Sequence, residues 1–185
     1  MICDFRSDTL TRPTAPMLEA MFNTPIGDDV FGEDPSVAAL ESYASSLFGM
    51  EAALFCPSGT MTNQIAIRVH CKPGDELICD EYAHIYRYEG GGISGNSGVS
   101  PKLIPGVRGK IEASQLEGTI NPDDPHFAKT TLVCLENTHN KGGGSCYSQA
   151  SIEAISLWCK NQGIPLHLDG ARLFNALVAT GQKPE

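Results

Sequence analysis

The stretch Thr130-Thr131-Leu132-Val133-Cys134-Leu135-Glu136 is the most strand-like segment of this 185-residue chain. Its interior is a continuous apolar run, which is typical of a strand buried on both faces of a sheet. A helical segment follows at residues 151–162 and ends before Gly163, and a second apolar strand follows at residues 165–169. The order strand, helix, strand is the unit from which parallel sheets are built.

The same alternation continues on both sides of this unit. We predict further strands at residues 52–56, 76–80 and 102–105, and further helices at residues 61–70 and 171–180. Strands that alternate with helices of about ten residues or more predict an α/β fold with three layers, in which helices cover both faces of a mostly parallel sheet.

The first 50 residues differ from this pattern. Two amphipathic helices are predicted at residues 13–22 and 36–48, and a glycine- and acid-rich loop at residues 27–35 separates them. We interpret residues 1–50 as an N-terminal arm that packs on the main domain or on a partner subunit. Residues 51–185 form part of the main α/β domain in this interpretation, and no clear linker separates the two parts.

Composition limits the class of protein. The chain has 22 acidic and 13 basic side chains and a formal charge of -9, which argues against a nucleic-acid partner. No apolar run approaches the roughly 20 residues that a membrane-spanning helix needs, and the first residues do not resemble a signal peptide. The seven cysteines are irregularly spaced and contain no Cys-x-x-Cys pair. We therefore expect a cytoplasmic protein without disulfides and without a membrane partner.

Open parallel sheets bind ligands at the carboxyl ends of their strands, so the residues that follow each predicted strand are candidate site residues. Ser58, Gly59 and Thr60 precede the helix at 61–70, where free backbone N–H groups and the helix dipole can bind a phosphate. Taken alone, these residues more often form an ordinary helix cap. His84 follows the strand at 76–80, where an imidazole could stack on an aromatic ligand or simply form a hydrogen bond within the loop.

Two charged residues lie at or just after the end of the strand at 165–169. Asp169 ends this strand, and a carboxylate in that position is costly unless it meets a cation, such as a protonated ring nitrogen. Arg172 can hold an oxyanion through two hydrogen bonds, although an internal ion pair with Asp169 is equally consistent with the sequence. Residues 136–140 form a dense polar cluster after the strand at 130–136, for which a simple turn is the alternative.

Together these strand ends provide a phosphate cradle, a stacking histidine, a carboxylate for a ring nitrogen and an arginine for a carboxylate. These groups are the ones needed to hold pyridoxal phosphate and an amino acid. The carboxylate would keep the pyridine protonated, so that the ring can accept electrons when a bond to the Cα of the amino acid breaks.

At these residues the chain resembles the low-specificity threonine aldolases, which are fold-type-I pyridoxal-phosphate enzymes. The resemblance runs in order through residues 4–11 (DFRSDTLT), 27–35 (GDDVFGEDP), 51–64 (EAALFCPSGTMTNQ), 136–140 (ENTHN) and 167–175 (HLDGARLFN). It implies the major domain of the aspartate aminotransferase-like fold, incomplete at the C-terminus. It also implies reversible cleavage of L-threonine or L-allo-threonine to glycine and acetaldehyde.

The resemblance assigns cofactor contacts to individual residues. Gly59 and Thr60 would bind the cofactor phosphate, with Ser58 nearby. His84 would stack on the pyridine ring, and Asp169 would pair with the ring nitrogen.

The resemblance also assigns contacts to a small β-hydroxy-α-amino acid substrate. Arg172 would lie near the hydroxyl of the cofactor ring and the substrate carboxylate, and Ser7 would help to hold that carboxylate. Either His84 or His126 would assist deprotonation of the β-hydroxyl group. Tyr88 would line the side-chain pocket.

The resemblance implies a homotetramer built as a dimer of dimers. The loop at residues 28–35 would approach the active site of a neighbouring subunit. Phe31 stands where tyrosine is common in the family, so any role of a hydroxyl group at this position is lost.

Two other patterns do not predict sites. Residues 90–95 (GGGISG) satisfy the Gly-x-Gly-x-x-Gly spacing, but they do not directly follow a strand and no clear helix follows them. The five histidines show no close metal-ligand spacing, so we expect no metal.

The chemistry of this family requires a lysine that forms a Schiff base with the cofactor. The resemblance places this lysine after the next strand in a Ser-Lys context, which none of the seven lysines has. We therefore expect residues 1–185 to be the N-terminal part of an active aldolase, without the lysine and the small C-terminal domain, and to be inactive alone. The alternatives are a truncated non-catalytic fragment, such as a phosphate-binding module, and a related β-eliminating lyase.

Overall fold

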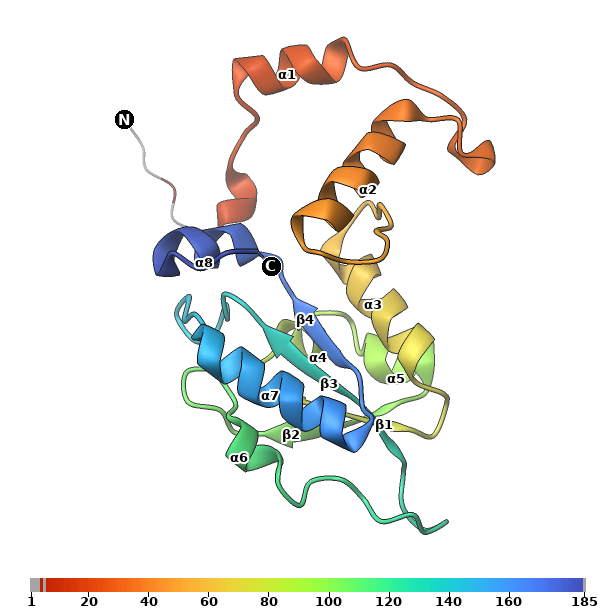
Figure 1. The fold of residues 1–185 in the computed structure, drawn as a ribbon, viewed down its shortest axis with the longest axis vertical. Coiled ribbons are helices and arrows are strands. Elements are labelled where there is room, and N and C mark those ends of the chain that lie inside the picture. Colours follow the sequence, from red (N-terminus) through yellow and green to blue (C-terminus); the bar gives the residue numbers. More distant parts are fainter. Residues whose placement is uncertain (1–3, 5, 185) are drawn as a thin grey trace. The chain divides into compact units, whose positions relative to one another are not determined.

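The computed structural model describes residue 4 and residues 6–184, and it divides the chain into two compact units (Figure 1). The first unit ends at Phe55, and the second spans Cys56–Pro184. No helix in the described part of the chain is long and apolar enough to cross a membrane.

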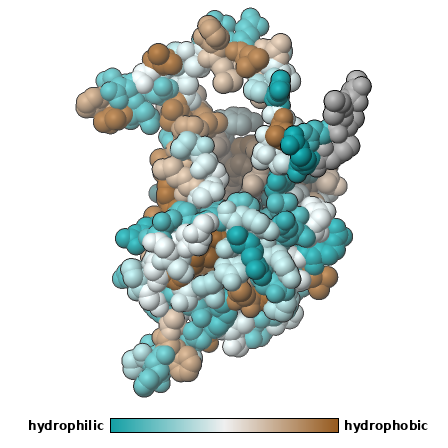
Figure 2. All heavy atoms as spheres, turned by 180° about the vertical axis from the view of Figure 1, so that it is seen from behind, coloured by the Kyte–Doolittle hydropathy of each residue, from teal (hydrophilic) through white to brown (hydrophobic). Residues whose placement is uncertain are grey.

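The first unit is helical. It contains the short 3-10 helices η1 (Asp8–Leu10) and η2 (Asp29–Phe31) and the α-helices α1 (Ala15–Phe22) and α2 (Pro35–Leu47). The start of α2 follows from the sequence, because the Asp34 carboxylate accepts hydrogen bonds from two backbone N–H groups of the first turn. Large apolar side chains of this unit are exposed, and they give the brown areas at the top of Figure 2.

The strand predicted at residues 52–56 is wrong. These residues form no ladder in the structure, and Leu54 and Phe55 are 69% and 51% exposed. The Phe55 N–H group donates to Glu41 Oε1 at 2.7 Å. A short apolar run fits a strand only where a neighbouring strand supplies partners, which the local pattern cannot reveal.

The second unit contains a four-stranded sheet in the order β2-β1-β3-β4, and all neighbouring strands are parallel. The strands are β1 (Glu76–Asp80), β2 (Ser100–Ile104), β3 (Thr130–Glu136) and β4 (Leu166–Asp169). This confirms the predicted α/β class and four of the five predicted strands, two of them with slightly different bounds. The pairing of Glu136 with Asp169 aligns the carboxyl ends of β3 and β4.

Helices connect and cover these strands. The helices are α3 (Gly59–His70), α4 (His84–Arg87), α5 (Gly92–Ser97), α6 (Ala113–Leu116), α7 (Gln149–Gln162) and α8 (Leu173–Thr180). Ser148 caps the start of α7, and Gly163 ends it with a φ of 68°. The expectation that no helix accompanies the glycine-rich residues 90–95 is wrong, because the short helix α5 begins within them.

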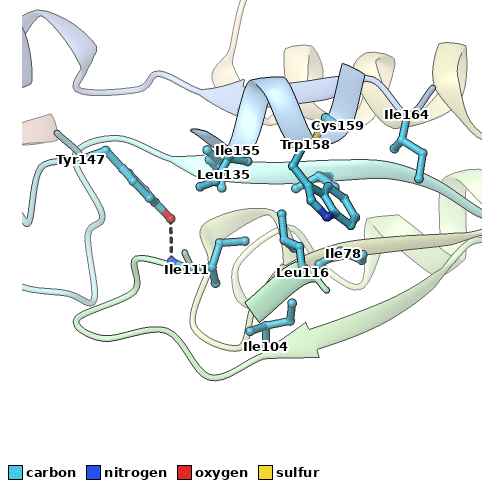
Figure 3. Packing of buried hydrophobic residues seen from close by; sticks show 11 residues of the cluster. Ile78, Ile104, Ile111, Leu116, Leu135, Tyr147, Ile155, Trp158, Cys159 and Ile164 are labelled. Carbon is cyan, nitrogen blue, oxygen red and sulfur yellow. Dashed lines mark hydrogen bonds between the residues drawn. The ribbon is translucent and has the colours of Figure 1, made fainter. Parts of the chain in front are cut away.

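The sheet separates two apolar cores, as expected for three layers. Alternate residues of β1 and β3 face opposite sides, so that Ile78 and Val133 enter one core while Leu77 and Leu132 enter the other. Figure 3 shows the first core, where α7 contributes Ile155 and Trp158. There the Tyr147 hydroxyl oxygen accepts a hydrogen bond from the Ile111 N–H group at 2.8 Å.

The six cysteines in the described part of the chain are free thiols, and Cys3 lies outside the described residues. Burial raises the pKa of the Cys79 thiol to about 12 and raises the pKa of Cys134 well above its ordinary value. These two thiols are therefore neutral core residues on β1 and β3 rather than nucleophiles.

Candidate functional site

Buried polar side chains gather at the carboxyl edge of the sheet. They include the strand-end residues Asp80, Glu136 and Asp169, the loop residues Asn137, Thr138 and His139, and Asn63 and Glu89 from covering segments. Buried polar groups are stable only when they are hydrogen-bonded, so their partners define how the site is built.

Asn63 and Asp169 form the centre of this group. Asn63 lies on α3 and is 2% exposed, and Asp169 ends β4 and is 8% exposed. Asn63 Nδ2 donates to Asp169 Oδ2 at 2.9 Å and to Glu89 Oε1 at 2.7 Å. On the other side of the Asn63 amide, Oδ1 lies 2.8 Å from His167 Nε2.

His84 lies beside this centre and is held at both its backbone and its ring. Its N–H group donates to Glu136 Oε2 at 2.7 Å, and its Nδ1 atom lies 3.1 Å from Glu89 Oε1. The structure therefore brings the predicted residues His84 and Asp169 into one hydrogen-bonded group through Asn63 and Glu89. The His84 side chain remains 35% exposed, so its ring is available to a ligand.

A second buried group supports the loop that follows β3. His139 is fully buried, and its Nε2 atom lies 3.2 Å from Asp80 Oδ1 and 3.6 Å from Glu136 Oε2. Burial alone would raise the pKa of the Asp80 carboxyl group, but hydrogen bonds from His139 and from the N–H groups of Tyr82 and Gly106 outweigh it and lower this pKa. Residues 136–139 are thus a packed support, whereas Asn140 is exposed and begins a turn.

Tyr88 borders the His84 ring. The two ring centroids are 5.6 Å apart with a tilted arrangement, and Tyr88 is 49% exposed. Lys141, from the loop after β3, places Nζ 5.0 Å from the centroid of the Tyr88 ring. Tyr88 therefore lies near the predicted stacking histidine, and a lysine that the sequence did not single out lies next to it.

The start of α3 offers backbone donors. Ser58 Oγ accepts the N–H group of Met61 at 3.2 Å, so the ordinary cap predicted as the alternative is present. The N–H groups of Gly59 and Thr60 belong to the first turn, where helices have no internal acceptors. Both residues are exposed, so a phosphate could reach these donors.

Arg172 and Ser7 are the residues predicted to hold the substrate carboxylate, and they belong to different units. Arg172 is partly buried at the start of α8, close in sequence to Asp169. Ser7 belongs to the first unit, where its hydroxyl accepts the Thr9 N–H group at 3.2 Å and caps η1. The loop at residues 28–35, with Phe31, also belongs to the first unit.

His126 is not brought together with this group. It lies in the loop that precedes β3, which is the amino edge of the sheet, and its side chain is 87% exposed. Its Nδ1 atom lies 2.7 Å from Asp124 Oδ1. A cleft of about 540 Å³ opens beside this loop, and Asp124, Phe127 and Lys129 are among its lining residues. The substrate role of His126 stays a prediction.

One grouping at the site could also hold a cation. His84, Glu89 and Asp169 each offer a ligand atom, and these atoms all lie within 4.8 Å of one another. No sequence pattern indicates this grouping, because Glu89 and Asp169 are far apart in the chain. Hydrogen bonds from Asn63 to both carboxylates already occupy part of their capacity as acceptors.

Sequence reasoning missed Asn63 and Glu89. The sequence does not show which face of this helix is buried, because the apolar residues Met61 and Val69 are 45% and 69% exposed, whereas Asn63 lies one turn before the fully buried Ile67. No pattern indicates Glu89 either, because it lies in an irregular segment between α4 and α5.

This chain is similar to known proteins along almost its whole length. A family model described as "Beta-eliminating lyase" matches residues 4–185. The chain belongs to the beta-eliminating lyase family. The resemblance noted in the sequence is thereby confirmed.

Curated relatives of this chain include proteins named as aldolases. The chain is 44% identical over 181 residues to the low specificity L-threonine aldolase of Escherichia coli O157:H7, covering 97% of this chain and 54% of that protein. It is 46% identical over 184 residues to low-specificity L-threonine aldolase 1 of Arabidopsis thaliana, covering 96% of this chain and 51% of that protein. The chain thus spans about half the length of the curated relatives it matches.

Two solved structures share the fold of this chain. The threonine aldolase of Leishmania major superposes with a TM-score of 0.75 at 29% identity, covering 88% of this chain and 46% of that chain. A putative L-allo-threonine aldolase from Listeria monocytogenes gives 0.73 at 25% identity, covering 91% of this chain and 46% of that chain. These structures confirm the predicted fold class.

Proposed function

We propose that the intact protein containing residues 1–185 is a pyridoxal-phosphate-dependent threonine aldolase. It would cleave L-threonine or L-allo-threonine reversibly to glycine and acetaldehyde. The observation that carries this proposal is the buried Asp169 carboxylate at the end of β4, joined through Asn63 and Glu89 to the partly exposed ring of His84.

The residues at this edge fit the cofactor. Asp169 is a buried carboxylate that a protonated ring nitrogen would neutralise, and burying such a carboxylate without a cation is costly. The free N–H groups at the start of α3 suit a phosphate, and the exposed part of the His84 ring suits stacking on an aromatic ring. When bound, pyridoxal phosphate supplies an electron sink for the bond that breaks at Cα.

The chain's own residues would bind and orient the amino acid and move protons. Arg172 and Ser7 would hold the substrate carboxylate, and Tyr88 would border the side-chain pocket. His84 or His126 would accept the proton of the β-hydroxyl group, which lets the Cα–Cβ bond break with formation of an aldehyde. The lysine that binds the cofactor covalently would come from outside residues 1–185, so we propose that these residues alone are inactive.

The substrate proposal is supported by the relatives named L-threonine aldolase, at 44% and 46% identity. The second candidate is another β-eliminating lyase, which the family description itself favours. The two reactions give different products, because an aldolase forms glycine and an aldehyde, whereas elimination from threonine would form ammonia and a keto acid.

We also propose a small-molecule amino acid as the only ligand class besides the cofactor, a homotetramer of the intact protein and a cytoplasmic location. Exposed apolar side chains of the first unit, including Phe22 at 94% and Phe31 at 76%, support burial against another subunit. Free thiols in the described part of the chain support a reducing compartment. Light scattering and cell fractionation would test these two points.

The experiment that tests the function is an assay of the intact protein with L-threonine and L-allo-threonine. We expect equal amounts of glycine and acetaldehyde, and a loss of activity in Asp169→Asn, since the amide cannot stabilise a protonated ring nitrogen. Asn96→Ala, at an exposed residue of α5, serves as the control and should remain active. Ammonia and keto acid as the products would overturn the aldolase proposal in favour of the lyase.

A further inference from the structure

The hydrogen-bond capacity of Asn63 fixes its orientation. Nδ2 has two hydrogens, and the two carboxylate oxygens of Asp169 and Glu89 at 2.9 Å and 2.7 Å accept one each. The Asn63 oxygen therefore faces His167 Nε2 at 2.8 Å and must accept from it. His167 is consequently the tautomer that carries its hydrogen on Nε2.

Glu89 has a fully buried side chain. A carboxylate without a proton only accepts hydrogen bonds. Its Oε2 atom accepts from Gln64 Nε2 at 2.6 Å, and its Oε1 atom accepts from Asn63 and lies 3.1 Å from His84 Nδ1. His84 then carries a hydrogen on Nδ1, and in the neutral form of the ring Nε2 has the free lone pair.

We propose that Glu89 is a positioning residue, which holds His84 as the Nδ1–H tautomer so that Nε2 is the nitrogen that accepts the β-hydroxyl proton. Asn63 is the second positioning residue, because it ties the Glu89 carboxylate to Asp169. This inference rests on the proposed aldolase function. It assigns the proton acceptance to His84 rather than to His126, which lies at the opposite edge of the sheet.

The step balances without any further reactant. The hydroxyl O–H bond breaks and an N–H bond forms at His84 Nε2. The electron pair of the O–H bond becomes the second bond of the aldehyde carbonyl, and the Cα–Cβ pair remains on Cα. A proton from the solvent then bonds to Cα to give glycine, and the proton on His84 Nε2 returns to the solvent.

The first test is the tautomer of His84 in the intact protein without substrate. With isotope-labelled histidine, nitrogen magnetic resonance distinguishes a protonated from a bare ring nitrogen. A His84→Gln variant assigns the signals by their loss. We expect a protonated Nδ1 and a bare Nε2 at His84, and the reverse at His167. A bare Nδ1 at His84 would overturn the proposal, and this measurement needs no variant of Glu89.

The second test uses Glu89→Leu, which removes the acceptor of the Nδ1 hydrogen, so that nothing holds His84 in one tautomer. We expect L-threonine cleavage to fall about 100-fold, the scale of general base catalysis. Exchange of the glycine α-proton with solvent deuterium should stay close to wild type, because it needs no β-hydroxyl proton transfer. Glu153→Leu, at an exposed glutamate of α7, is the matched control and should leave both reactions unchanged. Equal loss of both reactions in Glu89→Leu would indicate a merely structural role.

Failure of this inference can be told apart from failure of the proposed function. If the intact protein cleaves threonine but His84 has a bare Nδ1, only the inference fails. If His84 has the expected tautomer but threonine gives no glycine, the proposed function fails, and with it the catalytic part of the inference.

Discussion

At the scale of single residues, the site depends on buried polar groups whose positions are set by close packing. The ring of His139 is fully buried between Asp80 and Glu136, and Glu136 in turn holds the backbone of His84. Gly109 also packs against the His139 ring, and a Cβ atom there would lie 2.2 Å from that ring. Gly109 also has a φ of 78°, a conformation that L side chains disfavour.

We therefore predict that Gly109→Ala lowers the free energy of unfolding by about 3 kcal/mol or more, because strain and overpacking add. The matched control is Gly118→Ala, where φ is 73° but the space around the Cβ position is open. It should lose only about 1 kcal/mol, from the backbone term alone. Urea unfolding followed by the fluorescence of Trp158, the single tryptophan, measures both. Equal losses would show that the packing against His139 does not matter.

At the scale of elements, α3 and α7 both begin with a serine cap but lie on opposite sides of the sheet. Ser58 Oγ accepts the Met61 N–H group at the start of α3, and Ser148 Oγ accepts the Ser151 N–H group at the start of α7. The start of α3 is the proposed phosphate site, whereas α7 covers the sheet opposite the core that holds α3.

We predict that Ser58→Ala and Ser148→Ala each lower the free energy of unfolding by about 1 kcal/mol, because each removes one helix cap. Only Ser58→Ala should also weaken binding of pyridoxamine 5′-phosphate to the intact protein, since only its hydroxyl lies at the proposed phosphate site. Fluorescence titration with this probe measures the affinity. A similar loss of affinity in both variants would contradict the placement of the phosphate at α3.

At the scale of the whole molecule, the chain spans about half the length of its curated relatives. None of its seven lysines lies in the Ser-Lys context that the family resemblance requires. Lys141 is the lysine that the structure places beside the candidate site, with Nζ over the ring of Tyr88. Lys141 is therefore the lysine to examine for a covalent link to the cofactor, which we expect to be absent.

We predict that residues 1–185 incubated with pyridoxal phosphate and borohydride carry no reduced adduct at one preferred lysine. Peptide mass spectrometry measures the adduct, and Lys141→Met is the comparison that removes the lysine beside Tyr88. Low, scattered labelling that is the same in both chains is the expected result. A stoichiometric adduct at Lys141, lost in Lys141→Met, would contradict the proposal that the cofactor lysine lies outside these residues.

The sequence alone was sufficient for the parts of the fold that depend on local pattern. The apolar runs at residues 76–80 and 130–136 were recognised with the bounds that the structure has, because burial on both faces leaves a continuous apolar signal. The run at residues 52–56 carries the same signal without forming a strand, because strand formation requires a partner that is distant in sequence. His84 and Asp169 were identified because strand ends converge at one edge of a parallel sheet.

Only the tertiary structure identified Asn63 and Glu89 as the residues that connect His84 to Asp169. Asn63 is 106 residues from Asp169 and 26 residues from Glu89, and each contact depends on how α3 packs against the sheet. Hydrogen bonds between such distant residues leave no periodic trace in the sequence, since side-chain pairing is set by the packing of whole elements. The sequence by itself therefore determined the class of fold and the cofactor-binding residues to expect, whereas the packing decided how the ring of His84 is held and which nitrogen it presents.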